Sequence, residues 1–203
     1  SSDVCSSDLR IELSAASAWN YAVKAANLFT EDLDLPVGGG IRLALPPHWQ
    51  TVCLVFGVWL AGGRVTDDAE NCDIVIGVAG EPAHAVTSLD PWGGPCTRGV
   101  PSGTLDLGRE LRGQPDALMQ PRPFEGDIAA TIGGEELRWE QLHAGLDALI
   151  TGRIALAAHP SSRSISTTFI RAAAAAACGS TLVICALGER DVAGEQERID
   201  LWV

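Results

Sequence analysis

The feature of this sequence that most constrains its fold is one order of elements that occurs twice. In residues 13–65, a helix-patterned segment leads to a short apolar stretch, a turn with proline and His48, an apolar helix, a glycine pair and another apolar stretch. Residues 137–185 repeat that order, with His159 in the place of His48. Repeated strand-and-helix units are typical of layered α/β proteins. We therefore predict an α/β fold with parallel-sheet lobes related by internal duplication.

Apolar stretches between breakers indicate where the buried elements lie. Residues 41–45 and 72–78 have the composition of strands that are buried on both faces of a sheet. Residues 52–60 are apolar on nearly every side, so this helix must be buried or form an interface. Further along, two apolar stretches flank Gly133 and Gly134, which predicts a tight hairpin.

The distribution of proline and glycine suggests how the chain is divided. We expect a first α/β unit over residues 10–80, a Pro/Gly-rich connector over 81–126 that contains one short helix, and a second α/β unit over 127–203. Together these units are expected to form one compact domain, and residues 194–203 are predicted to be helical. Residues 1–9 resemble translated sequencing adapter, so we expect them to lie outside the fold and the true N-terminus to be missing.

Charge and cysteine usage exclude several classes of partner. The net charge is −12 and Lys24 is the chain's lysine, which argues against nucleic acid and anionic membrane surfaces. The longest apolar stretch has 16 residues and is interrupted by Gly179, so no membrane-spanning helix is predicted. The cysteines lack CxxC spacing, and His84 and His143 are isolated, so we expect a cytoplasmic protein without a metal site.

Several of these segments resemble motifs of the adenylate-forming enzymes. Residues 44–51 read ALPPHWQT and residues 59–63 read WLAGG. They resemble the family's strand that ends in LPNS-P and the KAGG that closes its next hydrophobic helix, and the second unit resembles the segment from LPLFH to AGATVVL. Over roughly residues 11–184 the chain is thus similar to the front of the large domain of AMP-binding acyl-CoA synthetases, luciferases and peptide-synthetase adenylation domains. It also resembles short, truncated AMP-binding-like proteins of high-GC bacteria.

The same resemblance places the family's phosphate loop, TSGTTGxPK, at residues 129–137. In the family, the amides and hydroxyls of this loop hold ATP phosphates and its lysine supplies positive charge. Here Thr131, Gly133 and Gly134 match by type, and two glutamates stand where a cation is expected. The family's later adenine, magnesium and ribose motifs have no counterpart in these 203 residues. The resemblance therefore implies a degenerate loop, no catalytic residue, and no ATP or AMP as cofactor.

His48 and His159 remain as candidate ligand-facing residues. Each follows a predicted parallel strand, and α/β folds place their sites at the carboxyl ends of such strands. The simpler interpretation is that both are turn histidines that arose by duplication.

Three functions remain open. The first is a non-catalytic relative of AMP-forming acyl-CoA synthetases that acts by binding or association. Self-association or a protein partner would then use apolar surface near Val52, Phe56 and Trp59. The second is a half-subunit of an adenylate-forming ligase that a partner chain completes, and this form would bind ATP or AMP. The third is a free small-molecule binding protein that uses the space between the lobes.

Overall fold

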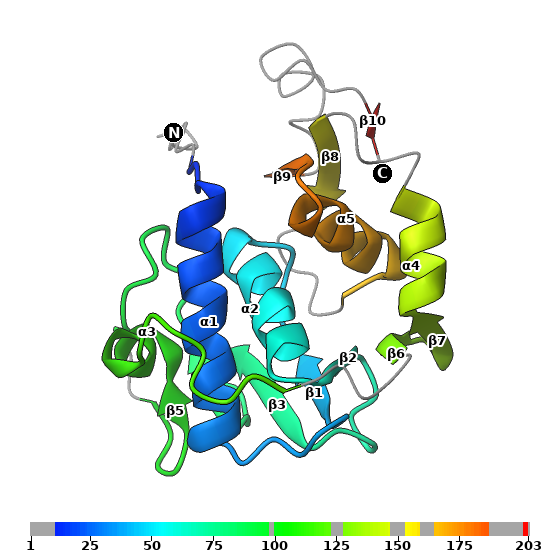
Figure 1. Cartoon of the computed structure of the whole chain (residues 1–203). Helices are drawn as coiled ribbons and strands as arrows, with labels where there is room; N and C mark the ends of the chain where they lie inside the picture. Colours follow the sequence, from blue (N-terminus) through cyan, green and yellow to red (C-terminus); the bar gives the residue numbers. More distant parts are fainter. Residues whose placement is uncertain are drawn as a thin grey trace, which may run out of the picture.

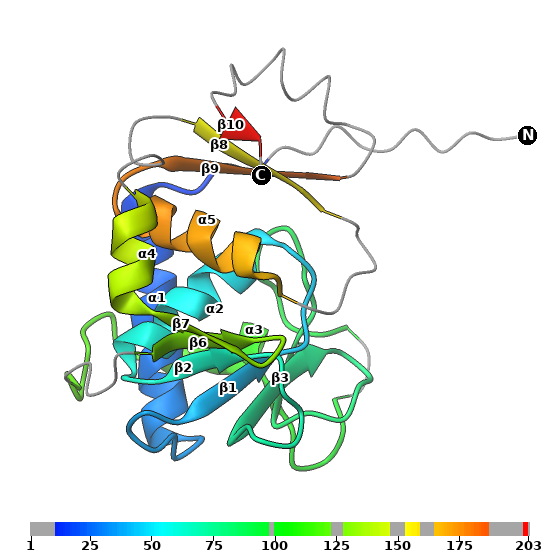
Figure 2. The same ribbon diagram turned by 90° about the vertical axis from the view of Figure 1, so that its right-hand side faces the viewer.

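The computed structural model describes residues 11–97, 100–122, 128–146, 153–158, 165–186 and 201–202. In this part of the chain, helices lie between two sheets (Figure 1). Helix α2 separates the larger sheet from α5, and α5 separates α2 from the smaller sheet (Figure 2). This layered arrangement confirms the predicted α/β class, with a mostly parallel seven-stranded sheet as its base.

The larger sheet has the strand order β5-β4-β3-β1-β2-β6-β7. Its strands are β1 (Gly40–Leu43), β2 (Arg64–Thr66), β3 (Ile74–Val78), β4 (Ala85–Thr87), β5 (Leu105–Asp106), β6 (Ile128–Ile132) and β7 (Glu135–Arg138). All neighbouring strands are parallel except β6 and β7, which form an antiparallel hairpin. The predicted strands at residues 41–45 and 72–78 are therefore present and adjacent, with Ile41 opposite Ile74.

Helices α1 (Ala15–Glu31) and α2 (Trp49–Leu60) pack against each other over this sheet. Helix α1 begins after Ser14, whose side chain accepts a hydrogen bond from the Ser17 amide and so caps the helix. The two helices approach closely because small residues line the contact. A Cβ on Gly57 would lie 2.7 Å from the Cβ of Ala25, so only glycine fits there at this helix separation.

The segment expected to be a connector contributes to the sheet. Within residues 81–126, β4 and β5 extend the sheet beyond β3, and α3 (Leu107–Glu110) with the 3-10 turn Leu111–Gly113 forms the expected short helix. Ala85 and Val86 are fully buried, which explains why so short a strand is stable. The connector prediction is therefore wrong for these strands, because two or three apolar residues between prolines and glycines give no periodic signal.

The second sheet has the order β10-β8-β9, with β8 (Arg153–Ala158), β9 (Thr181–Ala186) and β10 (Leu201–Trp202) all parallel. Helices α4 (Trp139–Leu146) and α5 (Thr167–Ala177) accompany it. The order helix, strand, helix, strand therefore occurs in both units as predicted, whereas their relation by duplication stays a prediction. The β6–β7 hairpin belongs to the larger sheet, and residues 201–202 form a strand rather than the predicted helix.

Helix α2 is covered within the chain. Val52 is 9% exposed and Trp59 5% exposed, and Phe56 is half-buried against the same core. Trp59 donates its Nε1–H to the carbonyl oxygen of Ala129 at 3.0 Å, and its ring lies 5.0 Å from that of Trp139. The expectation of exposed apolar surface around α2 is therefore wrong, because α1, β6, α4 and α5 cover this helix. Self-association or association with a protein partner stays a prediction.

Candidate functional site

The residues that match a phosphate loop by type form a tight hairpin turn. Gly133 and Gly134 connect β6 to β7, and Ile132 pairs with Glu135 across them. Both glycines have positive φ, 61° and 79°, as the two-residue turns that suit the twist of a hairpin require. Thr131 lies half-buried in β6 just before the turn. The predicted hairpin is confirmed, and its amides follow the geometry of a turn.

A carboxylate of the protein occupies this turn. Gly133 donates its backbone N–H to Oδ2 of Asp67 at 2.8 Å, and Asp67 donates its own N–H to the carbonyl oxygen of Thr131 at 3.2 Å. Glu136 pairs with Arg138 at 2.9 Å, so that guanidinium already faces an acid. The turn thus holds an internal anion, and an amide that is bonded to a carboxylate cannot at the same time bind a phosphate oxygen.

His48 caps helix α2. Its Nδ1 accepts a hydrogen bond from the Gln50 backbone N–H at 3.3 Å, and its ring lies 5.6 Å from that of Trp49. Burial lowers the pKa of His48 to about 4, so the imidazole is neutral at pH 7. This capping contact is a structural role, and a ligand-facing role for His48 stays a prediction. His159, the other histidine of the predicted pair, lies outside the described residues.

Next to His48, the first residues of α2 take part in a buried polar cluster that the sequence analysis did not predict. Gln50 donates from Nε2 to the Tyr21 hydroxyl at 3.4 Å, and the Tyr21 and Trp49 rings form a T-shaped pair with their centroids 5.3 Å apart. Burial raises the pKa of Tyr21 and raises that of the Cys53 thiol to about 12. The cluster is therefore uncharged at pH 7. The sequence signal for this cluster is a glutamine near the start of a mostly apolar helix.

Comparison with known proteins shows which proteins this chain resembles in sequence and in fold. No family model matches the chain. A curated relative, a TIGR03089 family protein of Mycobacterium tuberculosis (strain ATCC 25618 / H37Rv), is 33% identical over 144 residues, which are 63% of this chain and 58% of the relative. A fatty acyl CoA synthetase of Mycobacterium tuberculosis superposes with a TM-score of 0.65 at 14% identity, covering 95% of this chain and 43% of that one. The N-terminal domain of FACL13 from the same organism gives 0.66 at 15% identity, covering 92% and 54%.

This chain has the fold of the N-terminal part of AMP-binding enzymes. A third structure, ATP-bound MatB from Rhodopseudomonas palustris, agrees with a TM-score of 0.61 at 15% identity over 94% of this chain and 43% of that enzyme. The chain therefore spans 58% of its curated relative and less than half of MatB. At these identities the likeness to solved structures establishes the AMP-binding fold alone.

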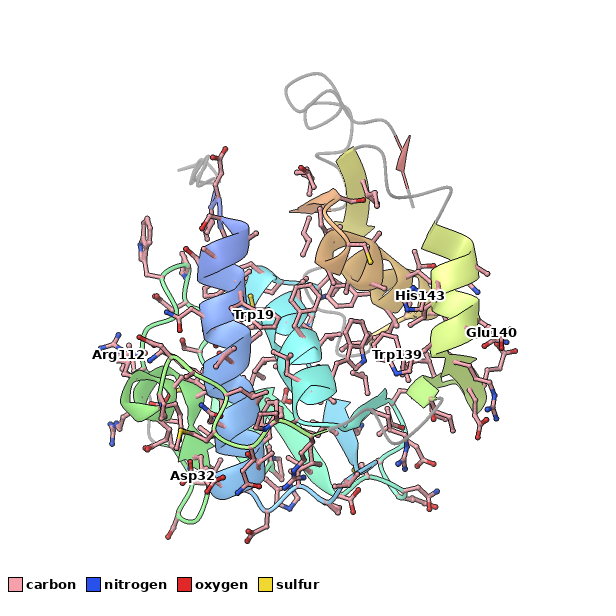
Figure 3. All side chains as sticks on the ribbon, viewed as in Figure 1. Trp19, Asp32, Arg112, Trp139, Glu140 and His143 are labelled. Carbon is pink, nitrogen blue, oxygen red and sulfur yellow. The ribbon has the colours of Figure 1, made fainter. Side chains whose placement is uncertain are left out.

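Within this AMP-binding fold, ring contacts between Trp59, Trp139 and His143 connect α2 with α4. Figure 3 shows Trp139 and His143 on the side of α4 that faces α2, whereas Glu140 points away. Trp139 lies 6.4 Å from His143 and also contacts Trp59, so His143 packs beside an aromatic ring. Among the described residues, no group of three or more His, Cys, Asp or Glu side chains could hold a metal ion. In the same part of the chain, no helix is long and apolar enough to cross a membrane.

Proposed function

We propose that this chain is a non-catalytic, cytoplasmic protein of the AMP-binding fold that acts by binding or association and does not use ATP. The observation that carries the proposal is the hydrogen bond from the Gly133 amide to the Asp67 carboxylate. This hydrogen bond supports the proposal because the protein's own carboxylate already binds the amide that a phosphate would need. The described cysteines Cys53, Cys72, Cys96 and Cys178 are free thiols, as is usual in a reducing compartment.

Electrostatics at the turn support the same proposal. A nucleotide phosphate would have to displace Asp67 and then remain beside Glu135 and Glu136, which are both exposed. Two like charges about 4 Å apart repel by roughly 4 kcal/mol at a surface-like dielectric of 20. Arg138 is the cation of this hairpin, and its charge is already shared with Glu136. Phosphate binding at this turn would therefore be unfavourable.

The test is carboxylate-dependent exchange of pyrophosphate into ATP with a broad panel of acids. We expect no exchange above background for the wild-type chain, with an active acyl-CoA synthetase as the positive control. Asp67→Asn removes the negative charge and keeps a side-chain oxygen that can accept from Gly133. This variant therefore distinguishes the effect of the charge from that of the hydrogen bond. Turnover in the wild type that is lost in Thr131→Ala would sink the proposal.

A second candidate function is a half-subunit that another chain completes into an adenylate-forming ligase. The observation that favours it is the coverage, because the chain superposes on the N-terminal part of a fatty acyl CoA synthetase and of MatB and spans 43% of each. Under this alternative, exchange should appear when the chain is mixed with a companion chain that carries the adenine and magnesium motifs. If neither the chain alone nor the mixture shows exchange, the first proposal is favoured.

A further inference from the structure

Residues 114–122 cross helix α1 and belong to neither a helix nor a strand. Figure 1 shows this segment, which follows the 3-10 turn after α3, passing over α1 on its way toward β6. Gln114, Leu118 and Arg122 are half-buried, and the other residues of the segment are exposed. Leu118 packs against the core, so the segment buries little apolar surface. We call residues 114–122 the strap.

A lysine of α1 holds the first part of the strap. Nζ of Lys24 donates to the carbonyl oxygen of Gln114 at 2.7 Å and lies 2.8 Å from Oδ1 of Asp116. The hydrogen bond from Lys24 lowers the pKa of Asp116, so this carboxylate is charged at pH 7. The Lys24 side chain is 21% exposed and that of Asp116 is 71% exposed, so water and dissolved ions reach the pair. The strength of this contact therefore depends on the salt concentration.

An asparagine of α1 holds the middle of the strap. Nδ2 of Asn27 donates to the carbonyl oxygens of Pro115 and Ala117 at 3.1 and 3.0 Å, and its Oδ1 accepts from the Met119 N–H at 2.9 Å. These partners fix the orientation of the amide, because two carbonyl oxygens require donors and an N–H requires an acceptor. Asn27 is 1% exposed, so the closed strap keeps its amide away from water.

Two more polar contacts join the strap to residues at the end of α1. Gln114 donates from Nε2 to Oδ2 of Asp32 at 2.6 Å, and the Arg122 guanidinium donates to the carbonyl oxygen of Leu35. These contacts, like those of Lys24 and Asn27, lie outside the pairing of the strands. The strands can therefore stay paired when the contacts of the strap break. Segments with few buried apolar contacts open at a lower free energy than the whole protein unfolds.

We propose that the strap opens as one unit while the sheet stays folded, and that the ion pair between Lys24 and Asp116 helps to hold it closed. Added salt, or loss of the Lys24 charge, then shifts the strap toward its open form. Opening uncovers the buried Asn27 amide on α1. The strap is thus a salt-sensitive conformational device, and it is independent of the β6–β7 turn and of any result with ATP.

The test is amide hydrogen exchange of the full chain, followed residue by residue by ¹H–¹⁵N NMR. The Met119 amide reports on the strap because it is bonded to Asn27, and the Ile76 amide in the buried strand β3 reports on global unfolding. We expect Met119 to exchange faster than Ile76 once both are corrected for their intrinsic rates. Raising sodium chloride from about 0.05 M to about 1 M should lower the protection of Met119 by about 2- to 5-fold, because screening weakens an exposed ion pair. The protection of Ile76 should not fall.

Lys24→Gln supplies the second arm, because it removes the charge and leaves the hydrogen bond between Met119 and Asn27 in place. We expect the Met119 amide of this variant to exchange about 2- to 10-fold faster than in the wild type, and its exchange should no longer depend on salt. Lys24→Arg keeps the charge and should keep the salt dependence. Arg138→Gln removes an exposed ion pair with Glu136 on the β6–β7 hairpin, so it is the matched control and should leave Met119 exchange unchanged.

Three results would overturn the proposal. Equal protection of Met119 and Ile76 would show that the strap opens only when the whole chain unfolds. Unchanged Met119 exchange in Lys24→Gln would show that the charge does not hold the strap. The same salt dependence in Lys24→Gln and in the wild type would assign the effect of salt to other charges.

Discussion

Gly57→Ala tests whether the contact between α1 and α2 is as close as the structure has it. Alanine gains up to about 1 kcal/mol over glycine in a helix, so propensity alone predicts a more stable protein. However, the new Cβ would lie 2.7 Å from the Cβ of Ala25 and 3.1 Å from the carbonyl oxygen of Ala22. Neither atom belongs to a flexible side chain, so the helices must move apart. Overpacking of this kind reaches about 3 kcal/mol.

The net expectation is a loss of about 2 kcal/mol, which lowers Tm by about 4 to 8 °C for a chain of this size. Thermal unfolding followed by circular dichroism measures it. Gly113→Ala is the matched control, because no atom lies within 4 Å of the place its new Cβ would take and its φ is not positive. Ala25→Gly combined with Gly57→Ala should recover part of the loss by removing the opposing Cβ. An unchanged or raised Tm in Gly57→Ala would refute the packing argument.

Two further predictions concern His48 and Trp59. The folded-state pKa of His48 is about 4 and the usual value is 6.5, so its contribution to stability is complete above pH 6.5 and is lost as pH falls toward 4. After allowance for partial exposure, the free energy of unfolding falls by about 1 to 2 kcal/mol over this range. His48→Asn can still cap the helix, and it should reduce the slope of the free energy of urea unfolding against pH between 6.5 and 4. A profile with the same slope in both proteins would contradict this. Trp59→Phe leaves the buried Ala129 carbonyl without its indole donor and should destabilise by about 1 to 3 kcal/mol in urea unfolding, whereas the exposed Trp92→Phe should change stability by less than about 0.5 kcal/mol. Equal effects of the two tryptophan substitutions would argue against the Trp59 hydrogen bond.

The parts of the fold that sequence predicted are those with a local signal. Strands β1 and β3 are apolar stretches between breakers, and Gly133 with Gly134 supplies the positive φ of a hairpin turn. Strands β4 and β5 escaped prediction because their stability comes from burial beside β3, and periodicity does not report burial. The burial of α2 was equally invisible, because a helix without a polar face reads the same in a core and at an interface.

Part of the candidate site could also be predicted from the sequence, and part could not. The position of His48 after a strand was readable from the sequence, and its role as a cap follows from the turn that it occupies. The contact of Gln50 with Tyr21 joins residues 29 positions apart on two helices, and that of Asp67 with Gly133 joins residues 66 apart. Such contacts depend on how the helices and strands are placed in three dimensions, which single-sequence patterns do not encode.

The pairing of β6 with β2 has a consequence for biosynthesis. Val65 lies opposite Ala130, so 130 − 65 = 65 residues must be added before this edge of the sheet can close. At about 5 to 20 residues per second, a ribosome needs about 3 to 13 seconds to add them. Closing so long a segment also costs about 4 kcal/mol of chain entropy. During this interval β2 has an unpaired edge, and the indole N–H of Trp59 lacks its hydrogen bond to Ala129. The nascent chain is therefore most vulnerable to wrong pairing in the seconds before residue 132 emerges.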